Sequence, residues 1–327
     1  MKAIVAAGAG GPEVLSMIEA PAPVPGPGEV LIDVVAAGIN RADVQQRRGF
    51  YPPPPGASDI LGLEVSGRIA GFGPHVTKPF SVGQKVVALL TGGGYAAQVV
   101  APAGQVLALP EGIDVISAAG LPEVAATVHS NLFMTAQLQA GETLLVHGGA
   151  GGIGAMAIQL AKAAGARVIA TAGSDEKVAM LTGYLGADAA VNYRTEDFVE
   201  RVRQFTGGAG ANVILDVVGA KYLARNVASL ATYGRLVVIG LQGGATAELN
   251  LGALLTKRAA VIGTTLRARP VEEKSAIMDG VRESVWPLVA SGAVKPMIDR
   301  TFPLEQASAA HQYFDSGAHV GKVLLTI

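Results

Sequence analysis

The 327-residue sequence contains no cysteine, and this absence excludes several kinds of chemistry. Without a thiol the chain can form no disulfide, use no thiolate nucleophile and hold no zinc through sulfur. Charge is also scarce, because Asp, Glu, Lys and Arg make up only 16% of the residues and the formal net charge is −1. Such a balance gives no electrostatic reason to expect nucleic acid or an anionic membrane as a partner.

Long apolar runs suited to a membrane span are missing too, although 50% of the residues are hydrophobic and the mean hydropathy is +0.40. The longest uncharged runs cover residues 86–110 and 124–141. Three consecutive glycines and a proline interrupt the first run, and several polar residues interrupt the second. The first residues lack the shape of a signal peptide and predict a strand. We therefore expect a cytoplasmic protein that makes no contact with a membrane.

The most informative segment is a short apolar strand, residues 143–147, followed by a glycine-rich turn. Gly149, Gly151 and Gly154 have the spacing of a dinucleotide-binding fingerprint, and an alanine-rich helix follows and can end at Gly165. Glycine permits the tight turn, a close approach of the backbone to a pyrophosphate and tight packing of helix on strand. The residues expected to bind the cofactor here are Gly148, Gly149, Ala150, Gly151, Gly152, Ile153 and Gly154.

Strands and helices alternate with short connections after this turn, which predicts a doubly wound parallel sheet of six strands. The further strands are expected at 167–171, 190–192, 212–217, 235–239 and 260–264. The helices between them are expected at 175–185, 197–206 and 222–230. This is the α/β pattern of a Rossmann domain.

The first hundred residues predict a β-rich lobe instead, with strands at 29–36, 85–90 and 95–100. Two proline clusters interrupt it, and we interpret them as stiff surface loops rather than as ligands of proline-binding modules. A helix at 304–314 and a strand at 322–327 are expected to return to this lobe. We therefore expect one domain from residues 1–122 and 266–327, and a dinucleotide-binding domain from residues 123–265.

Several separated motifs carry a family resemblance over essentially the whole chain. They are Asn40-Arg41-Ala42-Asp43, residues 49–56, residues 61–67, the glycine fingerprint and Gly321-Lys322-Val323-Leu324. Together they resemble the quinone oxidoreductase branch of the medium-chain dehydrogenase/reductase superfamily, and within it the p53-inducible quinone oxidoreductase subgroup near ζ-crystallin. The resemblance implies a GroES-like β-rich catalytic domain beside a Rossmann domain that binds NADPH.

The chain departs from the zinc-dependent members of that superfamily at two positions. Asn40 stands where those enzymes have a cysteine, and Leu63 stands where they have a histidine. An amide and an alkyl group cannot replace a thiolate and an imidazole in a tetrahedral site, so no metal is expected. Glu64 could act as a general base, but a packing or turn role is the preferred interpretation. The five histidines show no ligand spacing and are expected to be structural or exposed: His75, His129, His147, His311 and His319.

The choice of cofactor depends on the residues after the second strand of the expected Rossmann sheet. Gly173 leaves room, Ser174 can donate a hydrogen bond and Lys177 adds positive charge, which suits a 2′-phosphate. Asp175 and Glu176 point the other way, unless they only favour the start of a helix that Ser174 caps. The resemblance implies that Ser174, Lys177 and Tyr193 hold NADPH.

The resemblance also implies the residues of the reaction site. Asn40 is expected beside the nicotinamide, and Tyr51 is expected to bond the acceptor oxygen or the cofactor, with simple packing as the alternative. Further positions match family residues that contact the cofactor, namely Thr127, Val218, Gly240, Leu241, Thr264, Thr265, Leu266 and Lys322.

Three functions remain open at this point. The favoured one is an NADPH-dependent quinone reductase that passes a hydride, or single electrons, to a quinone without zinc. The second is an alkenal or enoyl reductase of the same fold that acts on an enone, and the third is a non-enzymatic NADPH-binding protein such as a crystallin. The apolar strand at 260–264 would leave an open sheet edge, where the family pattern suggests that two subunits form a homodimer.

Overall fold

The structure is a computed structural model that describes all of residues 1–327. The chain folds into two compact units, residues 1–126 with 266–327 and residues 127–265. It leaves the first unit within helix α3 (Pro122–Val128), a few residues after the boundary expected near residue 122. No helix is long and apolar enough to cross a membrane.

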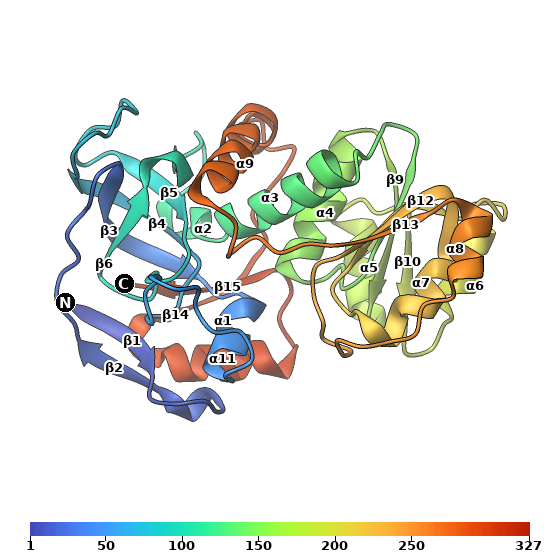
Figure 1. Ribbon diagram of the computed structural model, residues 1–327, viewed down its shortest axis with the longest axis horizontal. Coiled ribbons are helices and arrows are strands. Elements are labelled where there is room, and N and C mark those ends of the chain that lie inside the picture. The colour runs from blue at the N-terminus through green and yellow to red at the C-terminus, as the bar shows by residue number, and fades with distance from the viewer. The chain divides into compact units, whose positions relative to one another are not determined.

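The first unit is built on a mainly antiparallel sheet of seven strands (Figure 1). Their order is β14-β15-β3-β4-β5-β7, and β6 pairs with β3. The bounds are β3 Glu29–Gly38, β4 Glu64–Phe72, β5 Lys85–Leu89, β6 Gln98–Pro102, β7 Val106–Ala108, β14 Ile298–Pro303 and β15 Lys322–Thr326. Strands β1 (Lys2–Ala6) and β2 (Leu15–Glu19) form a separate two-stranded antiparallel sheet, and β1 is joined to the segment before β6 by a bridge between Ala3 and Ala96. Val30, Ile32 and Val34 of β3 alternate inward and are buried, so they contribute to the core of this unit.

Strand β6 begins later than the sequence suggested, at Gln98 instead of Tyr95. The backbone of Tyr95 has other partners, because its N–H donates to the Leu61 carbonyl and its own carbonyl accepts from Ile4. Tyr95 therefore packs with the loop at 61–63, and the strand predicted from the alternating pattern began too early in the sequence.

The helices of the first unit lie against this sheet and between its strands. They are α1 Arg41–Arg47, α2 Val115–Ala118, α9 Val271–Ser284, α10 Trp286–Ala290 and α11 Ala307–Ser316, with short 3₁₀ turns η1 Pro12–Val14, η2 Ala103–Gln105 and η5 Leu304–Gln306. Helix α11 buries Ala307, Ala310 and Phe314 at helical spacing. It is capped by Gly317, whose φ of 67° lies in the left-handed region that favours glycine.

The second unit contains the expected six-stranded parallel sheet, in the order β10-β9-β8-β11-β12-β13. Its strands are β8 Thr143–Val146, β9 Arg167–Ala172, β10 Ala189–Asn192, β11 Ala211–Asp216, β12 Leu230–Val238 and β13 Ala260–Gly263. Its helices are α4 Gly152–Ala163, α5 Asp175–Gly183, α6 Phe198–Phe205, α7 Leu223–Ser229 and α8 Leu251–Lys257, with the 3₁₀ turn η4 Ala220–Tyr222. Right-handed crossovers put α4 and α5 on one face and α6 and α7 on the other. The α/β fold expected from the sequence is confirmed.

Helix α8 was not expected between the last two strands, and two further details of the second unit differ from the expected elements. Strand β12 begins at Leu230 and not at 235, because its pairing with β11 skips from Leu230 to Arg235 across an irregular segment in which Tyr233 has a φ of 61°. A π-helix at His129–Thr135 continues helix α3 and was not expected. π-Helices are rare and occur often at functional sites.

Candidate active site

The glycine turn between β8 and α4 has the geometry of an anion-binding site. A Cβ atom on Gly154 would overlap the backbone of Gly148 and Gly149, and one on Gly149 would lie 2.9 Å from the Cβ of Ala170. Gly151 differs, since a Cβ there would meet only the Gly148 carbonyl, at 3.5 Å. No side chain caps the N-terminus of α4 at Gly151. The first-turn N–H groups are therefore available to a pyrophosphate, which this turn fits.

A buried histidine fixes the start of this turn. His147 contacts the Thr171 hydroxyl through Nδ1 at 3.2 Å and Asn226 Oδ1 through Nε2 at 2.7 Å. Asn226 donates its amide N–H to Asp216, so its oxygen must accept the Nε2 proton of His147. The Thr171 hydroxyl in turn accepts from the N–H of Gly148. Burial lowers the pKa of His147 to about 4, which keeps the ring neutral.

Asp216 extends the hydrogen-bond network of His147 and Asn226 to the end of β11. Its carboxylate accepts hydrogen bonds from the N–H groups of Val218 at 2.7 Å and Gly219 at 3.0 Å. This shapes the turn that presents Val218, and a Cβ on Gly240 would lie 2.8 Å from the Val217 carbonyl in the same region. Two positions expected to contact the cofactor, Val218 and Gly240, thus belong to adjoining turns, and Leu241 beside them is exposed.

The turn after β9 gathers the residues expected to select the cofactor. Ser174 caps α5 and accepts from the Lys177 N–H at 3.3 Å, as its capping interpretation predicted. A Cβ on Gly173 would lie 2.6 Å from the Tyr193 hydroxyl and 3.5 Å from Arg194 Nε. The structure therefore adds Arg194 to this group. It was not predicted from the sequence, although its position directly after Tyr193 was a signal that could have identified it.

The acidic residue beside this turn has a partner of its own. Asp175 Oδ1 accepts a 2.7 Å hydrogen bond from the side-chain amide of Asn192 on β10. This contact engages Asp175 at the start of α5, as expected of an acidic residue in the first turn of a helix.

Asn131 in the π-helix joins two of the expected cofactor residues. Its amide donates to the Thr127 carbonyl at 2.8 Å, and its oxygen accepts from the Thr264 hydroxyl at 2.5 Å. Asn131 is buried, so its bond to Thr127 is shielded from water, whereas its bond to Thr264 is partly buried. This residue was not expected from the sequence, because one asparagine inside an apolar run carries no recognisable signal. Thr265 follows Thr264 at the end of this unit, and Leu266 is buried in the other unit.

The first unit contains a buried cluster around Asn40, which precedes α1. Lys322 of β15 donates to Asn40 Oδ1 at 2.6 Å and to the Ile39 carbonyl at 2.9 Å, and it lies 2.6 Å from Glu64 Oε1. Since the lysine only donates, the Asn40 amide nitrogen must face away from it, and it donates to Glu64 Oε1 at 2.9 Å. Three acceptors match the three N–H groups of Lys322, so this ammonium positions Asn40 and Glu64.

Glu64 has a packing role in this cluster. Its second oxygen accepts from the backbone N–H of Glu123 at 2.9 Å, and the side chain is fully buried at the start of β4. With both oxygens engaged, the carboxylate ties three segments of the unit together. The preferred interpretation of Glu64 as a structural residue agrees with this arrangement.

The two positions that hold zinc ligands in related enzymes have no metal-binding chemistry here. Asn40 is committed to Lys322 and Glu64, and Leu63 is a buried hydrocarbon side chain. No group of three or more His, Asp or Glu side chains in the structure could hold a metal ion. His147 and His311, both buried, bond to protein side chains instead.

Tyr51 lies half-buried beside Arg267, and Lys274 bonds to the Arg267 carbonyl; neither cation was expected from the sequence. Arg267 places its guanidinium carbon 5.6 Å from the centre of the Tyr51 ring and donates to the Thr91 carbonyl at 2.8 Å. Lys274 of α9 donates to the Thr91 hydroxyl at 2.6 Å. Arg267 and Lys274 are 4% and 3% exposed, so both charges are largely removed from water. Burial also raises the pKa of Tyr51, which keeps its hydroxyl proton available for donation.

Comparisons with known proteins place the chain in a family. Residues 26–111 match the alcohol dehydrogenase GroES-like domain, and residues 152–280 match the zinc-binding dehydrogenase domain. The chain is 32% identical over 330 residues to a quinone oxidoreductase of Rattus norvegicus, covering 100% of this chain and 98% of the relative. It is 34% identical over 319 residues to quinone oxidoreductase 1 of Escherichia coli, covering 97% and 96%. The chain belongs to the quinone oxidoreductase branch of the medium-chain dehydrogenase/reductase superfamily.

Further relatives and solved structures extend this result. A 2-haloacrylate reductase of Burkholderia is 30% identical over 329 residues, covering 97% of this chain and 96% of the relative. The crystal structure of Escherichia coli quinone oxidoreductase complexed with NADPH aligns over 100% of both chains with a TM-score of 0.89 and 32% identity. The CurK enoyl reductase aligns over 99% and 98% with a TM-score of 0.87 and 28% identity. This chain is therefore an oxidoreductase, and the non-enzymatic alternative is set aside.

Proposed function

We propose that this protein is an NADPH-dependent quinone oxidoreductase that works without zinc. The observation that carries the proposal is the buried Asn40–Glu64–Lys322 cluster, which replaces a metal site with hydrogen bonds among protein side chains. An acceptor reduced here has to be electrophilic by itself, because no Lewis acid polarises it. A quinone meets that requirement, and the relatives named quinone oxidoreductases support it.

The residues after β9 support NADPH as the cofactor. Gly173 allows Tyr193 and Arg194 to approach the backbone closely, and Ser174, Lys177, Tyr193 and Arg194 supply donors or positive charge around this turn. The similar Escherichia coli structure was determined with NADPH bound. Together with the uncapped glycine turn, these residues could hold the 2′-phosphate and pyrophosphate of the dinucleotide.

The chain's own residues would bind and orient the acceptor. Bound NADPH would supply a hydride from the nicotinamide. The Tyr51 hydroxyl could donate a hydrogen bond to the acceptor oxygen, and the positive charge of Arg267, whose guanidinium carbon lies 5.6 Å from the ring centre, would favour negative charge that develops on that oxygen. Asn40 is held in one orientation by Lys322, as an amide beside the nicotinamide would have to be.

The cofactor assignment is tested by replacing Lys177 with alanine and measuring NADPH and NADH binding by titration calorimetry. A charge-assisted bond to the 2′-phosphate is worth roughly 1.5–3 kcal/mol, so NADPH should bind about ten-fold to a hundred-fold more weakly while NADH binding is unchanged. Lys162→Ala on α4 is the matched control, since Lys162 pairs with Asp188 instead. An equal loss for both dinucleotides in Lys177→Ala would contradict the assignment.

The acceptor is tested by comparing NADPH oxidation with 1,2-naphthoquinone, 1,4-benzoquinone, an enal, 2-chloroacrylate and an enoyl-CoA. We expect the highest kcat/KM with a quinone. The second candidate is reduction of an unsaturated acid, enal or thioester, which the names 2-haloacrylate reductase and enoyl reductase support, as do the buried cations Arg267 and Lys274. Turnover confined to the unsaturated acid or thioester would replace the quinone assignment.

We further propose a cytoplasmic homodimer joined through the second unit. Strand β13 pairs only with β12, and apolar side chains are exposed on and near it, among them Val261, Leu255 and Tyr233. An open, apolar edge strand tends to pair with another strand, and a second copy would extend the sheet across a two-fold axis. Light scattering at micromolar concentration should give twice the 33.1 kDa chain mass. A single-chain mass would contradict this proposal.

A further inference from the structure

Four buried side chains of the first unit form a continuous line of hydrogen bonds. Arg47 Nη1 of α1 lies 3.1 Å from His311 Nδ1 of α11, and His311 Nε2 lies 3.2 Å from the Tyr95 hydroxyl. The Tyr95 hydroxyl lies 3.2 Å from Asp43 Oδ2 of α1. All four side chains are fully buried, so no water competes for these bonds.

The chemistry of the first residue fixes the direction of every bond in the line. A guanidinium only donates, so His311 Nδ1 must accept from Arg47 and carry no proton. Neutral His311 then has its proton on Nε2 and donates to the Tyr95 oxygen. The Tyr95 proton is left for the Asp43 carboxylate. Burial and Arg47 lower the pKa of His311 to about 3, and burial and Asp43 raise the pKa of Tyr95, which agrees with this assignment.

The line ends where the segments of the Asn40 cluster meet. Asp43 Oδ2 also accepts from the Asn40 N–H at 2.8 Å, and Asp43 Oδ1 accepts from the Gly62 N–H at 3.1 Å. One carboxylate therefore ties the segment that carries Asn40 to the segment that carries Glu64. Gly62 has a φ of 103°, and a Cβ there would lie 2.6 Å from the Tyr95 ring, so the aromatic side chain fits closely over this junction.

The other end of the line reaches the surface of the unit. Arg47 Nη2 donates to Asp315 Oδ2 at 2.6 Å, and Asp315 also pairs with Arg41 and Arg48. The Asp315 side chain is 15% exposed. Arg47 is thus anchored by Asp315 on one side and donates to His311 on the other.

We propose that His311 and Tyr95 are positioning residues for the oxidoreductase reaction: with Arg47 they form an oriented relay of hydrogen bonds that keeps Asp43 a carboxylate and so holds Asn40 and Glu64 in place. This inference rests on the proposed function only in giving Asn40 a role beside the nicotinamide. A protonated Asp43 would carry a hydrogen on one oxygen and could no longer accept from all three of its donors.

The charged and titratable groups around Asp43 set the pH at which this loss occurs. Burial raises the pKa of Asp43 to about 6, and the Asn40 and Gly62 N–H groups, Lys322 and the Tyr95 hydroxyl act against that rise. Arg267 also faces the carboxylate with positive charge, whereas Glu123 faces it with a carboxyl group. Removing the Tyr95 donor should therefore raise the pKa of Asp43 further.

The test is the pH profile of kcat/KM for a quinone acceptor in Tyr95→Phe, a nearly isosteric change. We expect the acid limb to move up by about one pH unit, because the loss of one hydrogen bond to a charged carboxylate changes the pKa of that carboxylate by about one unit. Such a shift from about pH 6 to about pH 7 means about five-fold less activity than the unchanged protein at pH 6 and nearly equal activity above about pH 8. An unshifted profile, or the same loss at every pH, would refute the relay.

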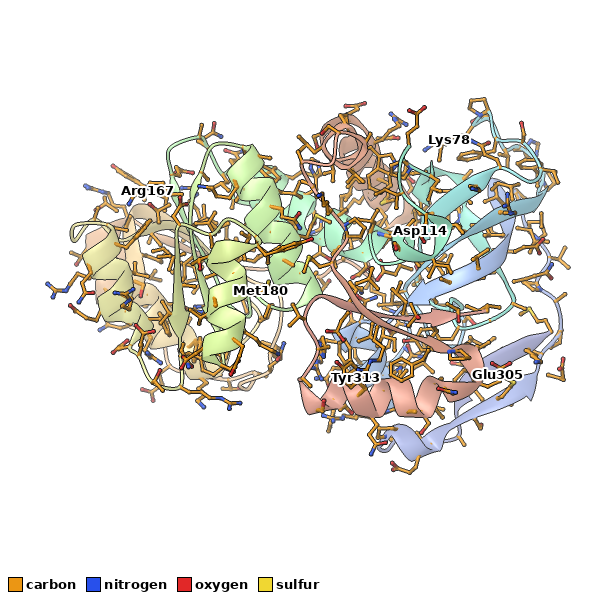
Figure 2. The ribbon with its side chains drawn as sticks, turned by 180° about the vertical axis from the view of Figure 1, so that it is seen from behind. Lys78, Asp114, Arg167, Met180, Glu305 and Tyr313 are labelled. Carbon is orange, nitrogen blue, oxygen red and sulfur yellow. The ribbon has the colours of Figure 1, made fainter.

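Two further variants separate the relay from general packing. His311→Leu should raise the acid limb by less than Tyr95→Phe does, because Tyr95 keeps its proton for Asp43 and loses only the donor that orients its hydroxyl. His311→Gln should leave the limb near that of the unchanged protein, since the Gln side chain can accept from Arg47 and donate to Tyr95. Tyr313→Phe on the same helix is the control (Figure 2), because the Tyr313 hydroxyl donates to Asp299 at 2.7 Å, outside the relay. A shift in the control, or no difference between the Leu and Gln variants, would count against the proposal.

A measurement without turnover keeps this inference separate from the proposed function. The imidazole nitrogen signals of His311 in the cofactor-free protein, assigned by their loss in His311→Gln, should show a neutral ring protonated on Nε2 from pH 8 down to pH 5. A proton on Nδ1, or protonation of the ring near pH 6, would refute the relay. A protein that reduced no quinone but showed the Nε2 proton would contradict the proposed function alone.

Discussion

Replacing Lys322 with methionine should destabilise the first unit strongly, because it leaves a buried carboxylate without its cation. Lys322 is 4% exposed and Glu64 is fully buried, and their charged atoms are 2.6 Å apart. Breaking a buried pair by removing one partner costs about 3–5 kcal/mol, whereas an exposed pair is worth about 0–1 kcal/mol. We therefore expect Lys322→Met to lower the free energy of unfolding by about 3–5 kcal/mol.

A second substitution should recover much of that loss. In Lys322→Met with Glu64→Gln the buried charge is gone, so the double variant should be about 1–4 kcal/mol more stable than Lys322→Met alone. Lys2→Met is the control, since Lys2 pairs with Glu305 at 3.2 Å on the surface with both side chains more than half exposed. Its stability should stay within about 0.5 kcal/mol of the unchanged protein.

The single tryptophan makes the assay selective for the unit that contains the pair. Trp286 is buried in the first unit and donates to the Ala108 carbonyl at 2.9 Å, so its fluorescence in urea follows the unfolding of that unit. A loss below about 1 kcal/mol in Lys322→Met would refute the reasoning, because a buried unpaired charge cannot cost so little. A double variant no more stable than the single one would refute it as well.

Three further predictions concern the reaction, the cofactor unit and metals. Tyr51→Phe should lower kcat/KM for a quinone by about ten-fold to a thousand-fold if the hydroxyl bonds the acceptor oxygen, and unchanged turnover would leave Tyr51 a packing residue. His147 has a folded pKa of about 4 against an ordinary value of 6.5, so its contribution to stability is complete above pH 6.5 and is lost as the pH falls towards 4. In urea unfolding followed by circular dichroism, His147→Gln should therefore lose about 2–3 kcal/mol less than the unchanged protein between pH 7 and 4.5, and parallel losses would disprove the neutral ring. Purified enzyme should keep full activity in a chelator because Asn40 and Leu63 offer no zinc ligands, and chelator-sensitive turnover would overturn the mechanism.

The local sequence pattern predicted an element correctly where the structure of that element depends on neighbouring residues alone. The glycine spacing at 149, 151 and 154 and the alternation of strands and helices predicted the parallel sheet, because turn geometry and hydrophobic periodicity act over a few neighbouring residues. The same pattern failed at the start of β6, where Tyr95 bonds to a distant loop, and at the start of β12, where the pairing is irregular. Boundaries of this kind depend on partners that are distant in the chain and leave no mark on the local pattern.

The candidate site likewise has one part that the sequence predicted and one part that only the folded structure revealed. The missing thiolate and imidazole could be recognised once the sequence motifs had shown the family resemblance, since Asn40 and Leu63 stand at the ligand positions of the zinc-dependent members and neither side chain can bind zinc as those ligands do. What replaces the zinc site became visible only in the folded protein. Lys322, Glu64 and Asn40 are far apart in the chain, and so are Arg47, Tyr95 and His311, yet each set is joined by hydrogen bonds that exist only once the sheet and its helices have formed. A buried polar group must find a partner wherever the fold places one, so pairings over such distances follow from packing and leave no periodic signal in the sequence.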